Sequence, residues 1–113
     1  MYHGHIYFPL RFAEQAETLR QKILSERKDV LETFPLIQRL VGPHKMPMFE
    51  IHFSNKESGI VEWLEQERGD MSVLIHPVTG GEETLDHTVR ATWLGRELGV
   101  FAVSYTHLTL PTT

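Results

Sequence analysis

The sequence has 113 residues, of which 41% are hydrophobic and 23% charged, so it can form one domain with one modest core. Its net charge of −4 and its intermixed acidic and basic residues exclude the dense positive patch with which proteins bind nucleic acid. It contains no cysteine, no run of about 18 apolar residues and no signal-peptide pattern, which excludes disulfides and thiolate chemistry and predicts a cytoplasmic protein without a membrane span.

The first predicted element is a β-strand at residues 2–8 (YHGHIYF), which ends at Pro9. Side chains two residues apart in a strand point to the same face, so His3, His5 and Tyr7 are expected on one face. Two imidazoles on one face of an apolar strand are either half-exposed surface groups or members of a site. The other histidines of the chain, seven in all, bear on that choice.

The next segments are predicted to form a helix and two strands. Residues 11–30 carry apolar side chains at spacings of three and four, which is typical of an amphipathic helix. Residues 32–41 predict a second strand at the edge of the sheet, because Pro35 interrupts it. A breaker-rich turn, residues 42–47, leads to residues 48–54, whose alternation predicts a half-buried third strand. The apolar stripe of the helix consists of Phe12, Ala16, Leu19 and Ile23.

A second helix and a fourth strand follow. Ser54 and Glu57 match a capping box, which predicts that a helix begins there and continues over residues 57–68 until Gly69 ends it. Residues 72–77 (SVLIHP) then predict a strand that stops at its proline.

The last segment before the C-terminal residues, 82–100, is expected to form a short helix or turn that carries Trp93. The order strand–helix–strand–strand–helix–strand is the split βαβ pattern of ferredoxin-like α+β folds. It predicts a four-stranded antiparallel sheet with two helices on one face, and with the first strand between the third and the fourth. The residues expected beneath the helices are Ile6, Phe8, Phe49, Ile51, Phe53, Val73 and Ile75. Those expected on the open face are His3, His5, Tyr7, Glu50, His52 and His76.

Strand direction predicts that the histidines of this face meet. The third and fourth strands run antiparallel to the first, so His52 and His76 should lie beside the N-terminal end of the first strand. Neutral imidazoles that converge are ligands for Fe(II), Zn(II) or Mn(II). Glu50 is on the same face but is expected toward the far end of its strand. The alternative is a sheet face that is polar because water touches it.

Three further histidines lie outside the predicted strands. His44 occupies a turn, where an imidazole is more often exposed than a ligand. His87 follows Asp86, which could orient it as a carboxylate partner or could be a helix cap beside a surface residue. His107 lies in the C-terminal tail and is not assigned a role.

Four blocks of the sequence resemble, in order, the DOPA 4,5-dioxygenase family of small enzymes that cleave aromatic rings. They are YHGHIYF, VGPHKMPMFEI, WLEQERGDMSVLIHPVTG and LDHTVRATWLG, and the resemblance covers about residues 2–98. It implies a ferredoxin-like fold and the extradiol cleavage of a catechol such as DOPA with O2 and a non-haem metal. The recurrent histidines of the family correspond here to His3, His5, His44, His76 and His87. The inclusion of Glu50 and His52 among the candidates depends only on the predicted alternation of their strand.

The resulting hypothesis is an Fe(II)-dependent dioxygenase, with Zn(II) or Mn(II) as alternatives, that acts on a small aromatic diol and O2. His5 and His76 are the favoured metal ligands, with His44 or His3 as the third. His3 or His87 could accept the catechol proton, because an imidazole titrates near working pH. The remaining assignments are Tyr7 as a hydrogen-bond donor to substrate or oxygen, and Glu50, His52 and Asp86 as secondary candidates.

A different class of function is also compatible with the pattern. Ferredoxin-like sheets can dimerise through their open faces, so the chain could be a non-catalytic or cofactor-free binding module whose histidines pack across a homodimer interface. A homodimer is expected under both hypotheses, since two chains could enclose a catalytic pocket. Metal content distinguishes the two.

The domain is expected to cover residues 1–103. Residues 104–113 (SYTHLTLPTT) show no core-facing pattern, and Pro111 would interrupt a strand. They are similar to translated vector or adaptor DNA, and we expect them to be a dispensable, non-native tail. The alternative is a genuine exposed C-terminal arm.

Overall fold

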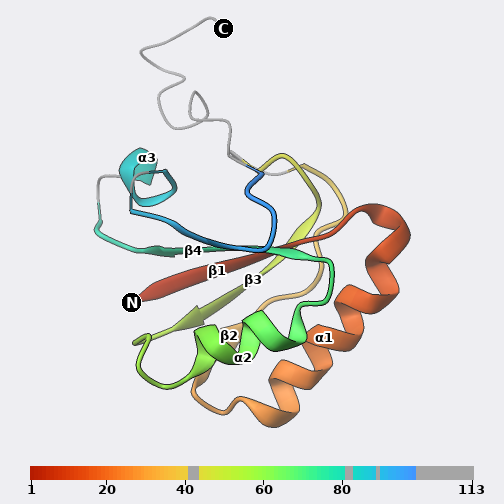
Figure 1. Cartoon of the computed structure of the whole chain (residues 1–113), viewed down its shortest axis with the longest axis horizontal. Helices are drawn as coiled ribbons and strands as arrows, with labels where there is room; N and C mark the ends of the chain where they lie inside the picture. Colours follow the sequence, from red (N-terminus) through yellow and green to blue (C-terminus); the bar gives the residue numbers. More distant parts are fainter. Residues whose placement is uncertain (41–43, 81–82, 89, 99–113) are drawn as a thin grey trace, which may run out of the picture.

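A computed structural model describes residues 1–40, 44–80, 83–88 and 90–98 of the chain. In chain order the elements are β1 (Tyr2–Tyr7), a 3₁₀ turn (Leu10–Phe12), α1 (Ala13–Glu26), β2 (Val30–Thr33), β3 (Met48–Phe53), α2 (Ile60–Glu67), β4 (Ser72–Pro77), α3 (Glu83–Asp86) and β5 (Thr92–Leu94), as drawn in Figure 1. Residues 104–113, with the predicted tail and His107, lie outside the described residues.

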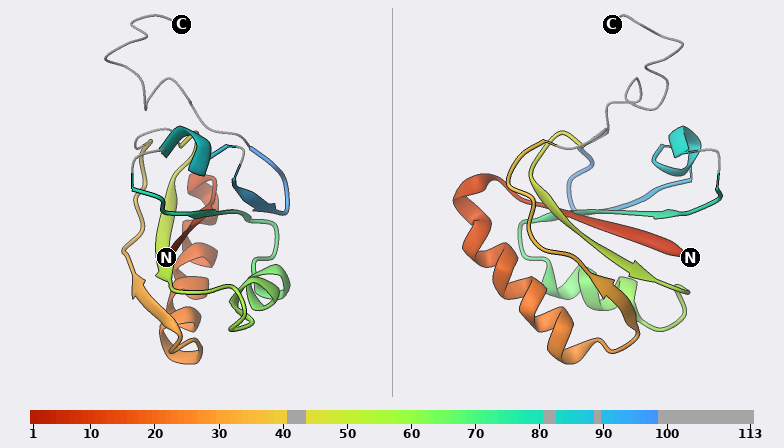
Figure 2. Two further views of the ribbon diagram at one scale, coloured as in Figure 1. Left: turned by 90° about the vertical axis from the view of Figure 1, so that its left-hand side faces the viewer. Right: turned by 180° about the vertical axis from the view of Figure 1, so that it is seen from behind.

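The strands form one antiparallel sheet in the order β2-β3-β1-β4-β5. The predicted place of β1 between β3 and β4 is confirmed, and so is the edge position of β2. Helices α1 and α2 lie on one side of the sheet, and α3 lies on the other (Figures 1 and 2). The α+β, ferredoxin-like architecture is therefore confirmed. No helix within the described ranges is long and apolar enough to cross a bilayer.

Two strand predictions need correction. The second strand is Val30–Thr33 rather than residues 32–41, because the chain turns away before Pro35, and only Ile37 rejoins β3 through a single bridge to Met48. The sheet also has a fifth strand where a helix or turn was expected for Trp93. After α3 the chain returns antiparallel to β4 and pairs Trp93 with Leu74.

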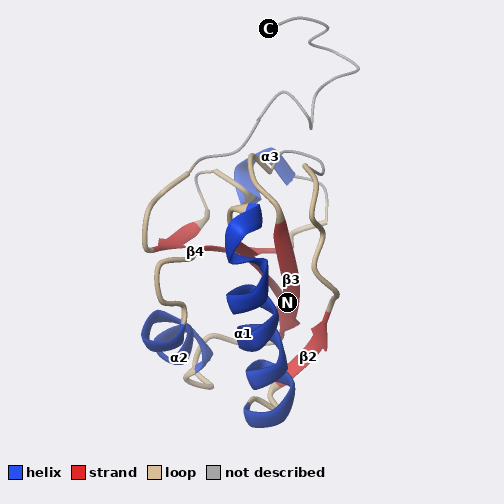
Figure 3. Ribbon diagram, turned by 90° about the vertical axis from the view of Figure 1, so that its right-hand side faces the viewer, coloured by secondary structure: helices blue, strands red, loops and turns tan. Residues whose placement is uncertain are grey.

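The main core fills the space between the sheet and the two long helices, and α1 crosses in front of the sheet in Figure 3. Its residues come from alternate positions of three strands and from one stripe of each helix, as the alternation predicted. Burying each large apolar side chain contributes about 1.5–3 kcal/mol. The fully buried members are Ile6, Phe8, Ala16, Ile23, Phe49, Ile51, Ile60, Leu64 and Val73, and Leu19, Phe53, Met71 and Ile75 complete the set.

The capping box does not form. Helix α2 begins at Ile60, and its N-cap is Gly59 with a φ of 90° and no side-chain hydrogen bond. The local Ser54–Glu57 pattern is overridden because residues 54–59 form turns before the helix starts. The predicted C-terminal end is confirmed: Gly69 has a φ of 59°, the left-handed conformation that commonly follows the last helical turn.

We expect Gly69→Ala to lower the free energy of unfolding by about 1 kcal/mol, since a Cβ atom is strained at positive φ even where space is free. Nothing lies within 4 Å of the Cβ position, so the loss comes from the backbone and not from a clash. Urea denaturation measures it. The control is Gln66→Ala in the exposed last turn of α2, which should change stability by less than about 0.5 kcal/mol. Equal effects of the two substitutions would contradict this account.

The face of the sheet that carries the histidines was expected to be open, and this was wrong for its centre. A second apolar cluster of Tyr7, Met48 and Leu74 lies on this face, and Trp93 packs against it from β5. The rings of Tyr7 and Trp93 are stacked, with centroids 5.7 Å apart. The return of the chain through α3 and β5 thus covers part of the face. His5 and His76 are each only 3% exposed.

Candidate metal and active site

The predicted convergence of histidines is present, and it follows from the strand register. Across the three central strands, His52, His3 and His76 form one row. In the adjacent row, Glu50 and Leu74 flank His5. Because cross-strand partners on one face lie side by side, these two rows bring four histidines and one carboxylate together.

Glu50 belongs to this group, which corrects the expectation that it lies toward the far end of its strand. It stands directly opposite His5 in the β1–β3 register. Its Oε1 atom is 3.6 Å from Nδ1 of His5, and its Oε2 atom is 3.5 Å from Nδ1 of His3. Oε2 also contacts Nε2 of His52. One carboxylate therefore touches three imidazoles.

Two more histidines reach the site from loops that precede β3 and follow α3. His44 is 4% exposed, although a turn position would more often leave it in solvent, and its Nδ1 is hydrogen-bonded to the hydroxyl of Tyr7 at 2.6 Å. The His87 ring lies 3.7 Å from that of His76, centroid to centroid. We call His5, His44, His76 and His87 the inner cluster, and His3, Glu50 and His52 the outer cluster.

Asp86 holds the turn that presents His87. Its carboxylate accepts hydrogen bonds from the backbone N–H of Thr79 at 3.1 Å, from the Thr79 hydroxyl at 2.9 Å and from Arg90 at 3.2 Å. Burial by itself would raise the pKa of Asp86, but these hydrogen bonds outweigh it and lower that pKa below its usual value. The ionised Asp86 therefore ties α3 to the end of β4.

Three of the inner histidines, His5, His44 and His76, are neutral at physiological pH. Burial is the largest cause that lowers the pKa values of His44 and His76 from 6.5 to about 4, and neighbouring imidazoles contribute to the shift. Burial also lowers the pKa of His5 well below its usual value, and that of His3 to about 4. A neutral imidazole offers a lone pair, which is the form that binds a metal.

The contact between His5 and His76 has a geometry that a shared cation would fit. Nδ1 of His76 is 2.8 Å from the Pro77 carbonyl, which can only accept, so this nitrogen carries the proton and Nε2 carries the lone pair. Nε2 of His5 lies 3.0 Å from that lone pair, and Nδ1 of His5 faces the Glu50 carboxylate without a hydrogen bond.

A neutral His5 has one proton for these two contacts. If the proton is on Nε2, the bare Nδ1 faces the Glu50 carboxylate; if it is on Nδ1, the bare Nε2 faces the lone pair of His76. A cation held by both Nε2 atoms removes this conflict and leaves the proton on Nδ1 for Glu50. With metal–nitrogen bonds of about 2.1 Å, two ligands at right angles are about 3.0 Å apart, which matches the observed separation. The residues present therefore fit a divalent metal.

Among the described residues, three sets of side chains place one potential ligand atom each within 4.8 Å of the others. His5 belongs to two of them, with His3 and His76 in one and with His44 and His87 in the other. The third set is the outer cluster. All six histidines of these sets were candidates from the sequence, but the sequence did not predict that His3 and His5 would each belong to two sets.

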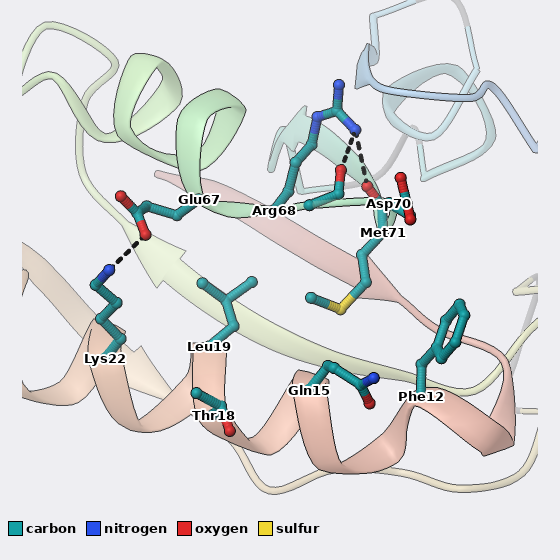
Figure 4. Close-up of a pocket in the computed structure, with 10 residues that line it drawn as sticks. Phe12, Gln15, Thr18, Leu19, Lys22, Glu67, Arg68, Asp70 and Met71 are labelled. Carbon is teal, nitrogen blue, oxygen red and sulfur yellow. Dashed lines mark hydrogen bonds and ion pairs between the residues drawn. The ribbon is translucent and has the colours of Figure 1, made fainter.

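A separate cavity of about 450 Å³ opens on the helix side of the sheet, between α1 and the turn that joins α2 to β4 (Figure 4). Two of its charged groups pair, Lys22 with Glu67 at 2.6 Å, and Arg68 donates hydrogen bonds to the carbonyls of Gly69 and Met71. No histidine is among the residues that line this cavity. The lining residues are Phe12, Gln15, Thr18, Leu19, Lys22, Glu67, Arg68, Gly69, Asp70 and Met71.

Two known proteins are similar in sequence to this chain. The chain is 34% identical over 104 residues to an uncharacterized 21.2 kDa protein of Botryotinia fuckeliana, and 31% identical over 102 residues to DOPA 4,5-dioxygenase of Amanita muscaria. Both alignments cover 83% of this chain, whereas the chain spans only 57% and 44% of the length of these two relatives.

A solved structure and a family model complete the comparison. The fold matches the crystal structure of a protein from Nostoc punctiforme provisionally assigned as a dioxygenase, with a TM-score of 0.85 and 28% identity. That match covers 96% of this chain and 92% of the other. The model of the Dopa 4,5-dioxygenase family matches residues 2–103, a span that includes both clusters. The chain therefore belongs to the Dopa 4,5-dioxygenase family.

Proposed function

We propose that the protein is a non-haem, metal-dependent extradiol dioxygenase that uses O2 to cleave the ring of a catechol such as DOPA. The observation that carries this proposal is the contact between His5 and His76. Both imidazoles are buried and neutral, and their Nε2 atoms face each other at a distance of 3.0 Å. Family membership supports oxygenase chemistry. Fe(II) is the ion we favour, because nitrogen ligands and open positions are typical of non-haem iron oxygenases.

His5 and His76 are the proposed metal ligands, and His44 is the proposed third. In this structure the ligand atoms grouped with those of both His5 and His76 are those of His3, whereas His44 is grouped with His5 and His87. When bound, the metal would supply Lewis acidity to the catechol oxygens and an electron path from the ring to O2. Burial of the three imidazoles keeps them neutral and excludes water that would compete with them. The hydrogen bond from Nδ1 of His76 to the Pro77 carbonyl fixes the tautomer that leaves Nε2 available.

Proton transfer is assigned to His87, with His3 as the other candidate. His87 packs against His76 but is less buried than the three proposed ligands, so it can meet a substrate that enters from the exposed side. An imidazole there can accept the proton of a catechol hydroxyl as the oxygen binds. His3, at 24% side-chain exposure, is also within reach of an entering ligand.

Tyr7 is better suited to positioning a ligand than to touching substrate, because it is 1% exposed and its hydroxyl is bonded to His44. We expect Tyr7→Phe to weaken metal binding by about 10- to 100-fold, since a ligand whose second nitrogen loses its partner is less well oriented. Isothermal titration with Zn(II) measures this change. The control is Ser72→Ala, a buried polar residue on the same face of β4, which should bind as wild type does. Unchanged affinity in Tyr7→Phe would remove Tyr7 from the site.

The function itself is tested with protein purified without oxygen and loaded with Fe(II). We expect oxygen uptake on addition of DOPA or another catechol, and a yellow ring-opened product, with neither appearing in chelator-treated protein. Catechol analogues with one hydroxyl methylated should be inert, because a substrate held through two adjacent oxygens needs both of them. Stable metal binding without oxygen uptake on any catechol would favour the non-catalytic binding module.

A further inference from the structure

We propose that the outer cluster, formed by His3, Glu50 and His52, is a second divalent-metal site beside the inner one. Nothing in the proposed dioxygenase mechanism uses these three residues together. They nevertheless form a set of two imidazoles and one carboxylate on a single sheet face. This site goes beyond the proposed function and does not depend on it.

The strand register places the three ligands. His3 and His52 are cross-strand partners of β1 and β3, and their rings are stacked 3.6 Å apart at an angle of 5°. Glu50 precedes His52 by two residues on β3 and so projects from the same face. Its Oε2 atom lies 3.5 Å from Nδ1 of His3 and contacts Nε2 of His52. One nitrogen of each ring therefore faces the same carboxylate oxygen.

The ligand set selects the class of ion. Two imidazoles with one carboxylate suit Fe(II), Zn(II), Co(II) or Mn(II), whereas Ca²⁺ and Mg²⁺ prefer oxygen ligands alone. The three side chains are 20–24% exposed, so an ion and its remaining water ligands can reach them from solvent. Three of the inner histidines, His5, His44 and His76, are 3–4% exposed, and so the two sites differ in access as well as in chemistry.

The two sites adjoin at His3, which also forms a set with His5 and His76. His44 and His87 belong to a set that contains no member of the outer cluster. A second link is Glu50, whose Oε1 atom faces Nδ1 of His5 while Oε2 faces the outer imidazoles. His52 is the most selective position to change, because its side chain contacts His3, Glu50 and Phe34 and belongs to neither set that contains His5. A change at His52 should therefore empty the outer site and spare the inner one.

The experiment is a count of bound ions. Protein stripped with a chelator is titrated with Co(II) at pH 7.5, and binding is followed by calorimetry and by the visible spectrum of the bound ion. We expect two ions per wild-type chain, one in His52→Gln and one in His44→Gln. Two ions in His52→Gln, or a single wild-type ion that His52→Gln retains, would overturn the proposal.

The remaining outcomes also separate the two sites. A single wild-type ion that is lost in His52→Gln but kept in His44→Gln would support the outer site and refute the inner one. If His52→Gln fails to fold by circular dichroism, the wild type alone suffices: imidazole nitrogen resonances of His3 and His52 should shift as Zn(II) is added. If neither resonance responds up to saturation, the outer cluster is an ion-pair network and not a metal site.

Discussion

Replacing His5 with glutamine is expected to weaken Fe(II) or Zn(II) binding at the inner cluster by at least about 100-fold and to reduce oxygen uptake in proportion. His5 is the residue common to both sets that involve the inner histidines, so its loss leaves neither set complete. Glutamine is close in size, and so the change removes a ligand without opening a large cavity in a position that is only 3% exposed. Metal affinity is measured by competition with a chromophoric chelator.

The matched control for His5→Gln is Ser72→Ala, which alters a buried polar side chain on β4, in the row of Tyr7 rather than that of His5. It should retain wild-type affinity and turnover. The melting temperature of chelator-treated protein should differ little between His5→Gln and wild type, which separates loss of a ligand from loss of the fold. Wild-type affinity in His5→Gln would refute the inner site.

Metal-free protein is expected to lose several kcal/mol of stability as the pH falls from 6.5 to about 4. In this window the unfolded chain protonates its histidines near 6.5, while burial holds the pKa values of His44 and His76 at about 4 in the folded state. The unfolded state therefore binds more protons, and stability falls with falling pH. A shift from 6.5 to about 4 corresponds to at most about 3–4 kcal/mol for each of the two groups, and His5 adds to the effect. For comparison, the whole free energy of unfolding of a typical domain is about 5–15 kcal/mol.

Urea denaturation in the presence of a chelator, from pH 7.5 to pH 4.5, measures this dependence. His44→Gln removes one of the titrating groups and should reduce the slope by up to about 1.4 kcal/mol per pH unit, whatever its effect on absolute stability. Stability that stays constant across the window, or equal slopes in the two proteins, would mean that the histidines are not held neutral by burial.

Much of the fold was predictable because its main features depend on the period of the apolar residues along each strand and on the order of the elements along the chain. Strict alternation in β1, β3 and β4 sorted His3, His5 and Tyr7 from the core residues, and an error of one residue would have reversed the faces. The place of β1 between its neighbours followed from the order of elements, and with it the row that joins His3, His52 and His76. These inferences need no knowledge of side-chain packing.

The features that sequence did not predict depend on contacts between distant segments. His44 is buried because a loop packs over Tyr7, and His87 is presented by the contacts of Asp86 with Thr79 and Arg90. Neither loop path has a periodic signal. The fifth strand was missed because three residues around Trp93 are too few to show alternation, and they pair only because β4 offers a free edge. The Ser54–Glu57 pattern was a local signal that the turn before Gly59 overrode.

The central place of β1 has a consequence for the synthesis of the protein on the ribosome. His5 and His76 are 71 residues apart. At 5–20 residues per second, the strand that carries His5 must therefore wait about 4 to 14 s before its second neighbour has been translated. Throughout that interval an apolar strand has at least one unpaired edge, which is a template for association with other chains. We expect nascent chains stalled before β4 to be bound by chaperones, and their release to require the emergence of residues beyond His76.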